Sequence, residues 1–354
     1  LKHMSPTSEP KPTPPQVLIS LASEGARQAA RACVMAMRVP PTELAPGPQL
    51  VQRLRDMLHA FPSSAALVDL AHLQAGAVHI AALAAALPDA SQRERIFLVR
   101  ENAGLWPADV SWARELGFAG LWGQIDAAAL TGQDDTLAAS LATRIGLAPI
   151  TPLVLSQYFS ALRIKPDPAT PRGRIRAATG LPAESLCNAL ATGVKALDRV
   201  YRLTTYPSCH TGTEAVDWLC ERFRLQRDKA VQLGLDLQAL GLLQHVVHEQ
   251  PFADRPNFYR LTQSTAVDRW NPGVVDRLLR EPTGVAVADR KYLAKTYANC
   301  FVGSEAVTWV AGRFKLRRHE AEILLNRLHR LHLIEHVTRD HPVRDGNFFY
   351  RFVD

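Results

Sequence analysis

The sequence predicts an N-terminal α/β domain with a parallel sheet, followed by two copies of a small α+β unit. Short apolar runs alternate with Ala-rich helical segments from Gln16 to about residue 147, and this alternation is typical of a parallel sheet covered on both faces. Residues 198–260 align without a gap on residues 289–351, and 27 of the 63 pairs are identical. This identity indicates an internal repeat. At 354 residues the chain has room for two or three domains.

The net charge of +7 is concentrated in the repeat half of the chain. Residues 16–150 carry 10 Lys/Arg against 12 Asp/Glu, whereas residues 151–354 carry 29 against 21. Such a balance suits an anionic partner, which could be lipid headgroups, an acidic protein or nucleic acid, although solubility alone also explains it.

The cysteines are odd in number and scattered, which fits a reducing compartment. They are Cys33, Cys187, Cys209, Cys220 and Cys300. No secretory signal is visible, and no apolar run approaches the roughly 18 to 20 residues of a membrane span. We therefore expect a cytoplasmic protein, peripheral at the inner membrane face if it docks on lipid.

Residues 1–15 hold five prolines among polar residues and read as a disordered arm or tag remnant. The next region, 16–147, contains the predicted elements of the α/β domain. Its strands are expected at 17–20, 65–70, 95–99 and 120–122, and its helices at 24–37, 49–60, 74–87 and 107–116.

Each repeat copy has the order helix, helix, helix and two strands. The motif Gly-x-Glu-Ala-Val-x-Trp, at 212–218 and 303–309, opens one helix, and apolar residues at helical spacing predict the next. Two short apolar and aromatic runs then predict a β-hairpin, while the leading helix comes from residues before Asp198. This is the order of a winged helix.

The segments 206–219 and 297–310 resemble the signature of the DEP domain. They read Tyr-Pro-Ser-Cys-His-Thr-Gly-Thr-Glu-Ala-Val-Asp-Trp-Leu and Tyr-Ala-Asn-Cys-Phe-Val-Gly-Ser-Glu-Ala-Val-Thr-Trp-Val. The resemblance covers 183–265 and 272–354, and it implies non-enzymatic signalling modules that dock on membranes or partner proteins. The first copy departs from the pattern at His210 and Thr211, where the second has Phe301 and Val302.

The α/β region resembles the flavodoxin-like receiver domain of response regulators, through its element order, Leu67-Val68-Asp69 and the segment 113–120. This resemblance makes Asp69 the candidate phosphoacceptor. A working receiver also needs an acid pair, a hydroxyl and a lysine around a metal-bound phosphoryl group. Residues 21–23, 99–101 and 123–124 stand at those places and lack them. We therefore prefer a degenerate, pseudo-receiver domain that regulates or forms a homodimer, with phosphorylation at Asp69 as an alternative.

Six prolines mark residues 148–182 as a connector with a helix at 153–163. Within it, 174–186 resembles a helix-turn-helix, but a pair of helices packed on the first repeat copy is the interpretation we favour. A DNA-binding regulator is the second alternative, since winged helices can place a helix in the major groove. The helices in question, 228–240 and 319–331, offer few base-reading side chains. These are Gln232, Asp236 and Gln238 in the first and Glu322, Asn326, Arg327 and His329 in the second.

Basic residues cluster at equivalent places between two helices of each copy, interleaved with apolar residues. The cluster of the first copy is Arg222, Arg224, Arg227 and Lys229, and that of the second is Arg313, Lys315, Arg317 and Arg318. Four positive charges in a short turn could bind anionic lipids or an acidic protein, and they could also simply cap helix C-termini. We take these eight residues as the candidate docking site.

Histidines gather in the second copy, at positions 319, 329, 332, 336 and 341, but without an obvious converging third ligand we expect no metal. Cys209 and Cys300 read as buried packing residues. No phosphate-binding glycine loop, Ser/His/Asp set or paired carboxylates occur in the sequence, so we expect no cofactor and no enzyme activity. The predicted function is that of an intracellular signalling adaptor.

Overall fold

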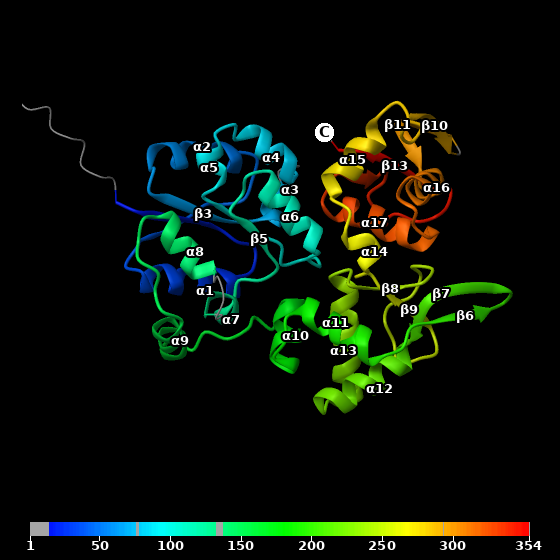
Figure 1. Cartoon of the computed structure of the whole chain (residues 1–354), viewed down its shortest axis with the longest axis horizontal. Coiled ribbons are helices and arrows are strands. Elements are labelled where there is room, and N and C mark those ends of the chain that lie inside the picture. Colours follow the sequence, from blue (N-terminus) through cyan, green and yellow to red (C-terminus); the bar gives the residue numbers. More distant parts are fainter. Residues whose placement is uncertain (1–13, 76–77, 132–136, 293, 354) are drawn as a thin grey trace, which may run out of the picture.

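The computed structural model describes residues 14–75, 78–131, 137–292 and 294–353. Most of the predicted arm at 1–15 lies outside these ranges. Figure 1 shows the α/β domain on one side, and the two repeat copies stacked one above the other on the opposite side.

The α/β domain is built on a five-stranded sheet whose paired strands are all parallel. Its strands are β1 (Gln16–Ser20), β2 (Pro41–Glu43), β3 (Ser64–Asp69), β4 (Ile96–Val99) and β5 (Gly120–Trp122). They lie in the order β2-β1-β3-β4-β5, with Leu18 opposite Ala66 and Leu67 opposite Phe97. The predicted parallel sheet is confirmed, and its order is the flavodoxin-like one. The receiver identity itself stays a prediction.

Helices cover both faces of this sheet because successive strand residues point to opposite sides. They are α1 (Glu24–Ala36), α2 (Leu50–Ala60), α3 (Leu70–Ala75), α4 (Ile80–Ala86), α5 (Ala90–Arg93), α6 (Pro107–Glu115), α7 (Ala127–Thr131) and α8 (Leu137–Arg144). Leu18, Ala66 and Leu98 pack with α2, α4 and α6. Val17, Leu67 and their neighbours pack on the other side with α1 and α8.

The helix predicted at 74–87 is divided into α3 and α4. The ring nitrogen Nδ1 of His79 accepts a hydrogen bond from the backbone N–H of Ala82 at 3.2 Å. This cap satisfies an otherwise unpaired donor at the start of α4 and begins a new helix there.

The connector contributes α9 (Pro152–Ala161) and α10 (Pro171–Thr179), and α11 (Ala183–Gly193) follows as the leading helix of the first repeat copy. Leu155 and Phe159 of α9 are buried in the core of the α/β domain. Ile175 and Leu186, from the segment that resembles a helix-turn-helix, are buried in the core of the first repeat copy. The connector therefore packs on both neighbours.

Each repeat copy contains a four-stranded antiparallel sheet, in the order β6-β7-β9-β8 or β10-β11-β13-β12. The elements of the first copy after α11 are β6 (Leu197–Tyr201), β7 (Thr204–Thr211), α12 (Gly212–Phe223), α13 (Arg227–Ala239), β8 (Leu243–His245) and β9 (Phe258–Leu261). Those of the second are α14 (Thr265–Asp268), α15 (Pro272–Arg280), β10 (Ala288–Tyr292), β11 (Lys295–Val302), α16 (Gly303–Phe314), α17 (Arg318–Arg330), β12 (Ile334–His336) and β13 (Phe349–Phe352).

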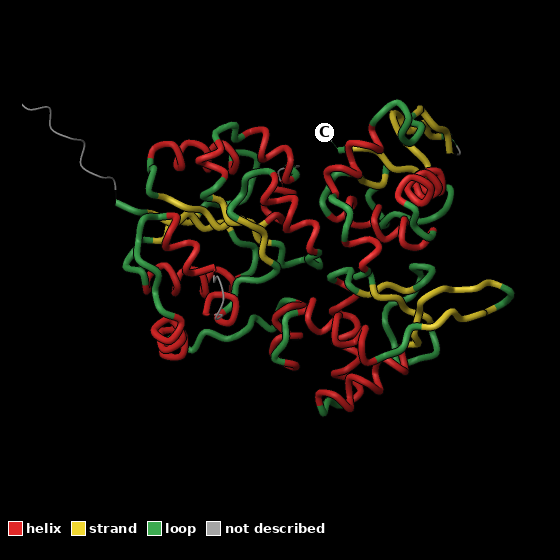
Figure 2. Tube along the Cα trace, in the orientation of Figure 1, coloured by secondary structure: helices red, strands yellow, loops and turns green. Residues whose placement is uncertain are grey.

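The sequence prediction of two strands per copy was incomplete, because a hairpin precedes the Gly-x-Glu helix in both. The β6–β7 hairpin projects away from the body of the molecule in Figure 2. Most residues of β6 are exposed on both faces, so they lack the apolar alternation by which a half-buried strand is recognised.

Several identities between the copies correspond to equivalent contacts. Arg199 pairs with Glu214 at 2.7 Å, and Arg290 pairs with Glu305 at 2.9 Å. The Tyr259 hydroxyl donates to the carbonyl of Pro251 at 2.8 Å, as Tyr350 does to Pro342 at 3.0 Å. The ion pair ties the hairpin before the Gly-x-Glu helix to that helix, and the tyrosine contact closes the loop between the last two strands, which we call the wing loop (246–257 in the first copy and 337–348 in the second).

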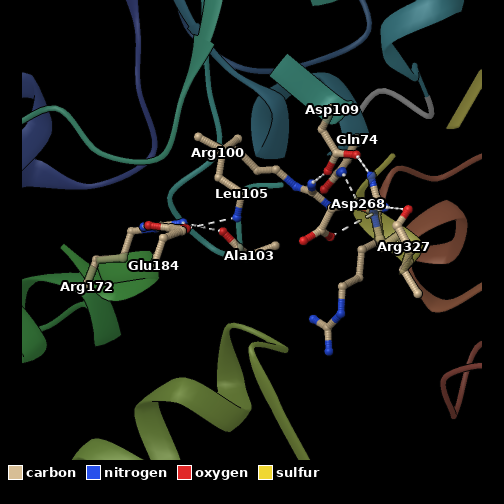
Figure 3. Close-up of polar contacts among 11 residues, drawn as sticks. Gln74, Arg100, Ala103, Leu105, Asp109, Arg172, Glu184, Asp268 and Arg327 are labelled. Atoms are coloured by element: carbon tan, nitrogen blue, oxygen red, sulfur yellow. Dashed lines mark hydrogen bonds and ion pairs between the residues drawn. The ribbon is translucent and has the colours of Figure 1, made fainter. Parts of the chain in front are cut away.

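Each repeat copy contacts the rest of the chain through an ion pair at an equivalent helix position. The residue at this position is acidic in the first copy and basic in the second. In α13 this position is Asp236, which pairs with Arg174 of α10 at 2.6 Å. In α17 it is Arg327, which pairs with Asp109 of α6 at 2.7 Å, and Asp109 also pairs with Arg100 at 2.8 Å (Figure 3). Asp109, Arg100 and Arg327 are each no more than 1% exposed.

The loop from Arg100 to Trp106 joins all three parts of the chain. Arg172 of α10 donates to the carbonyls of Glu101 and Ala103 at 3.0 and 2.6 Å, and it pairs with Glu184 of α11 at 2.7 Å (Figure 3). The backbone N–H of Gly104 donates to the carbonyl of Leu240 at 2.7 Å. We call this loop together with Asp109, Arg172, Glu184 and Arg327 the junction.

Asp109→Asn should destabilise the protein strongly, because it leaves the buried guanidinium groups of Arg100 and Arg327 without their shared counter-charge. Breaking a buried ion pair by removing one partner costs about 3–5 kcal/mol. Urea unfolding would measure this loss. Asp56→Asn, at an exposed site on α2, is the matched control. An equal effect of both substitutions would contradict the role of the junction.

Candidate functional site

Asp69 lies at the carboxyl end of β3 and is 1% exposed. Its carboxylate accepts the backbone N–H of Ala71 at 2.9 Å and that of Ala22 at 3.4 Å. Burial raises its pKa, although these hydrogen bonds act in the opposite direction. The contacts tie the start of α3 and the loop after β1 to the sheet, so access of a phosphoryl donor would require this edge to open.

The rest of this sheet edge is filled by the protein itself. Glu101 lies near Asp69, and burial, reinforced by the charge of Asp69, raises its pKa to about 7. The Arg172 guanidinium packs against Gly123, where an added Cβ would lie 2.9 Å from Nη1. The cavity between Ser23, Glu101 and Gln124 measures about 10 Å³, which is room for about one water.

In the basic cluster of the first copy, one side chain forms ion pairs with carboxylates and the other three do not. Arg227 pairs with Asp254 of the wing loop at 2.6 Å and with Asp217 at 2.7 Å. Arg222, Arg224 and Lys229 are exposed, and among the described residues no carboxylate pairs with them. Arg224 ends α12 in the left-handed conformation, at φ 54°. We call these three residues the free basic patch.

In the second copy two of the four basic side chains form ion pairs and two do not. Arg318 pairs with Asp345 at 2.5 Å, in the position equivalent to the Arg227–Asp254 pair. Arg317 pairs with Glu320 at 3.0 Å and approaches Ser208 of the first copy at 3.4 Å. Arg313 and Lys315 are exposed and form no ion pair within the described ranges. Three of the eight predicted docking residues therefore act as internal ties.

The helices that lead into the two basic clusters lie apart. Figure 1 shows α12 at the lower edge of the first copy and α16 in the upper half of the molecule, well separated in the view. A membrane contact that used both clusters for avidity would have to span this separation.

Of the two helices considered for DNA recognition, α17 is covered by other parts of the chain, and the candidate base-reading side chains of α13 already have partners within the protein. Nine consecutive residues of α17, from Glu320 to Leu328, are buried. In α13, Asp236 is engaged by Arg174, and the Gln238 amide bonds to backbone groups of Gln250 and Phe252. Burial therefore keeps α17 out of a groove in this arrangement, whereas α13 keeps an exposed face on which Gln232 bonds to Asp236.

The histidines that come together in the structure are His336 and His341, which lie beyond α17 and close to Asp340. Ligand atoms of His336, Asp340 and His341 lie within 4.8 Å of one another. The Nδ1 atom of His336 is 2.6 Å from the Asp340 carboxylate, and the rings of His336 and His341 stack at 4.0 Å. A carboxylate hydrogen bond and ring stacking account for this geometry.

Sequence reasoning missed the junction charges Arg100, Asp109, Arg172 and Glu184. Charged side chains are usually exposed, and nothing in the local pattern marks these as buried. One indication of burial was available for Asp109, because its neighbours in the same short helix, Ala108, Trp112 and Ala113, are apolar.

The buried Glu101 should make stability fall as pH rises from 4.5 to about 7. Its pKa in the folded state lies above its ordinary value of 4.5, so in this window the folded protein retains a proton that the unfolded chain has lost. The linkage amounts to about 3 kcal/mol at most. Glu101→Gln should abolish this part of the pH dependence in urea unfolding. Glu221→Gln, at an exposed site, should leave it unchanged, and a parallel loss in both variants would contradict the assignment.

Comparison with known proteins identifies the repeated unit. The family model described as "Domain found in Dishevelled, Egl-10, and Pleckstrin (DEP)" matches residues 193–261 and 284–352. Within the described ranges, no helix is both long and apolar enough to cross a membrane.

Curated relatives match part of this chain at moderate identity. Vacuolar membrane-associated protein iml1 of Emericella nidulans is 38% identical over 77 residues, covering 21% of this chain and 4% of that protein. The mouse phosphatidylinositol 3,4,5-trisphosphate-dependent Rac exchanger 1 protein is 28% identical over 168 residues, covering 44% of this chain and 10% of the relative. The chain thus matches only a small part of these much longer relatives. Its repeat is a pair of tandem DEP domains.

Proposed function

We propose that the chain is a non-enzymatic signalling adaptor whose tandem DEP domains dock on an anionic membrane surface. The observation that carries this proposal is the free basic patch, Arg222, Arg224 and Lys229, whose charges are not neutralised by any described carboxylate. An unpaired cation near an anionic bilayer contributes about 1 kcal/mol.

The names of the relatives support a membrane role. One is named as vacuolar membrane-associated and another as dependent on phosphatidylinositol 3,4,5-trisphosphate. We expect this chain to act as a peripheral protein at the cytoplasmic face of a membrane. An acidic protein partner, which would use the same charges, is the alternative outcome.

We assign the α/β domain a regulatory role as a pseudo-receiver. Asp69 is buried, and Arg172 and Glu101 fill the sheet edge where a phosphoryl group would need a metal and a lysine. The junction transmits any movement of this edge to both DEP domains, because Arg172 bonds to Glu101 in the loop while Arg327 pairs with Asp109 just after the loop and lies over the ring of Trp106. Dimerisation through this domain remains a prediction.

Charge reversal of the free basic patch should weaken docking on anionic vesicles. In Arg222→Glu/Arg224→Glu/Lys229→Glu, losing three contacts of about 1 kcal/mol each lowers affinity on the order of 100-fold. Co-sedimentation of the full chain with phosphatidylserine-containing and pure phosphatidylcholine vesicles, at low and physiological salt, measures this. The full chain is needed because the DEP domains share buried contacts with the α/β domain.

A matched control reverses three exposed arginines of the α/β domain, Arg53, Arg55 and Arg114. It has the same change in net charge and should bind the vesicles nearly as the unmodified chain does. Arg313→Glu/Lys315→Glu tests the second cluster separately. Absence of binding at either salt, or equal loss in patch and control variants, would refute docking through the patch.

A further inference from the structure

A cavity of about 190 Å³ lies where the two DEP domains meet the α/β domain. Trp106 comes from the α/β domain, Gln244 and His245 from the first copy, and Arg327 and Arg330 from the second. The volume is below the roughly 300 Å³ of ordinary small-molecule sites, so it suits a small ligand.

The buried polar atoms around this cavity are mostly nitrogen atoms able to donate. Arg327 Nε, Gln244 Nε2, His245 Nδ1 and Trp106 Nε1 are all buried and have no hydrogen-bond partner among the described residues. Buried donors without partners are rare in folded proteins, because each costs about 1–3 kcal/mol. All four residues line this one cavity, and an acceptor bound there would satisfy the three obligate donors together with His245 in its Nδ1–H tautomer.

The charge around the cavity is positive. The Arg330 guanidinium lies over the backbone of Gly241, where an added Cβ would be 2.1 Å from Cζ, and no acceptor for its side chain occurs in the described part of the chain. Burial, with the nearby charge of Arg100, lowers its pKa to about 10. Arg100 and Arg327 share the single carboxylate of Asp109.

The neighbouring carboxylates do not supply the missing charge. Asp268 lies 4.0 Å from Arg327, and burial raises its pKa to about 6. Glu322 bonds to the ring of His248 at the contact between the two copies. Arg330 is partly buried, and among the described residues its positive charge has no acidic partner of its own.

We propose that this cavity is a binding site for a small free phosphate-bearing anion, held between Arg330, Arg327 and the donors of Gln244 and His245. A tetrahedral oxyanion accepts hydrogen bonds from several directions at once and matches guanidinium groups in particular. Since its walls come from three parts of the chain, the bound anion stabilises their packed arrangement. The site is separate from the free basic patch and does not depend on the proposed membrane docking.

Millimolar inorganic phosphate, compared with chloride at equal ionic strength, should raise the melting temperature of the full chain by at least about 3 °C. Low concentration matters because concentrated phosphate stabilises most proteins by exclusion from their surface. Isothermal titration calorimetry with the same ion should show saturable binding.

Arg330→Gln should abolish the phosphate-dependent increase while leaving the melting temperature in chloride equal or higher, since the substitution removes a partly buried charge that no described carboxylate compensates. Gln244→Leu should reduce the increase at least several-fold without changing net charge. Arg277→Gln, an exposed arginine on α15, is the matched control and should retain the full increase.

Three results would overturn the proposal. One is an absent or non-saturable response to phosphate, and another is an increase that survives in Arg330→Gln. The third is a melting temperature of Arg330→Gln that falls equally in both buffers, which would make Arg330 a structural residue. Vesicles containing phosphatidic acid form a separate arm. Binding of Arg330 to that lipid headgroup, without any response to free phosphate, would reject the free ligand as the source.

Discussion

The carboxylate of Asp109 lies between the guanidinium groups of Arg100 and Arg327, and the arrangement of the three parts of the chain depends on this contact. All three side chains are almost completely buried. Trp106 packs beside them, with both guanidinium carbons within 5.6 Å of its ring centroid. A buried charge is tolerated only when it is paired, so separating α17 from α6 would expose or strand two cations. This constraint explains why the second DEP domain sits against the α/β domain.

The internal repeat is symmetric in its local contacts and asymmetric in its docking. The same ion pair between hairpin and Gly-x-Glu helix, and the same tyrosine hydroxyl contact, recur in both copies. The equivalent positions Asp236 and Arg327 nevertheless carry opposite charges and reach different partners. One fold thus occupies two distinct places in the molecule, and the first copy keeps its basic turn exposed.

The proposed membrane docking and the proposed binding of a small anion use different cations. Exposed cations such as Arg224 can contact a partner of any size, whereas Arg330 lies in a cavity that admits only a small ligand. A membrane signal and a soluble anion could therefore act on the chain at different places. The loop from Arg100 to Trp106 borders the internal cavity and also receives Arg172 from the connector. It is the element through which the two events would be coupled.

The sequence by itself determined the repeated module, the parallel α/β domain and the places where basic residues gather, because each depends on local spacing or direct identity. It did not reveal the β6–β7 hairpin, whose exposed residues carry no periodic signal. Only the tertiary structure decided which cations are free, since Arg227 is neutralised by Asp254, 27 residues away. It also decided that α17 is buried, through the pair of Arg327 with Asp109 across 218 residues. Pairing and burial depend on distance in space, which the order of residues along the chain does not specify.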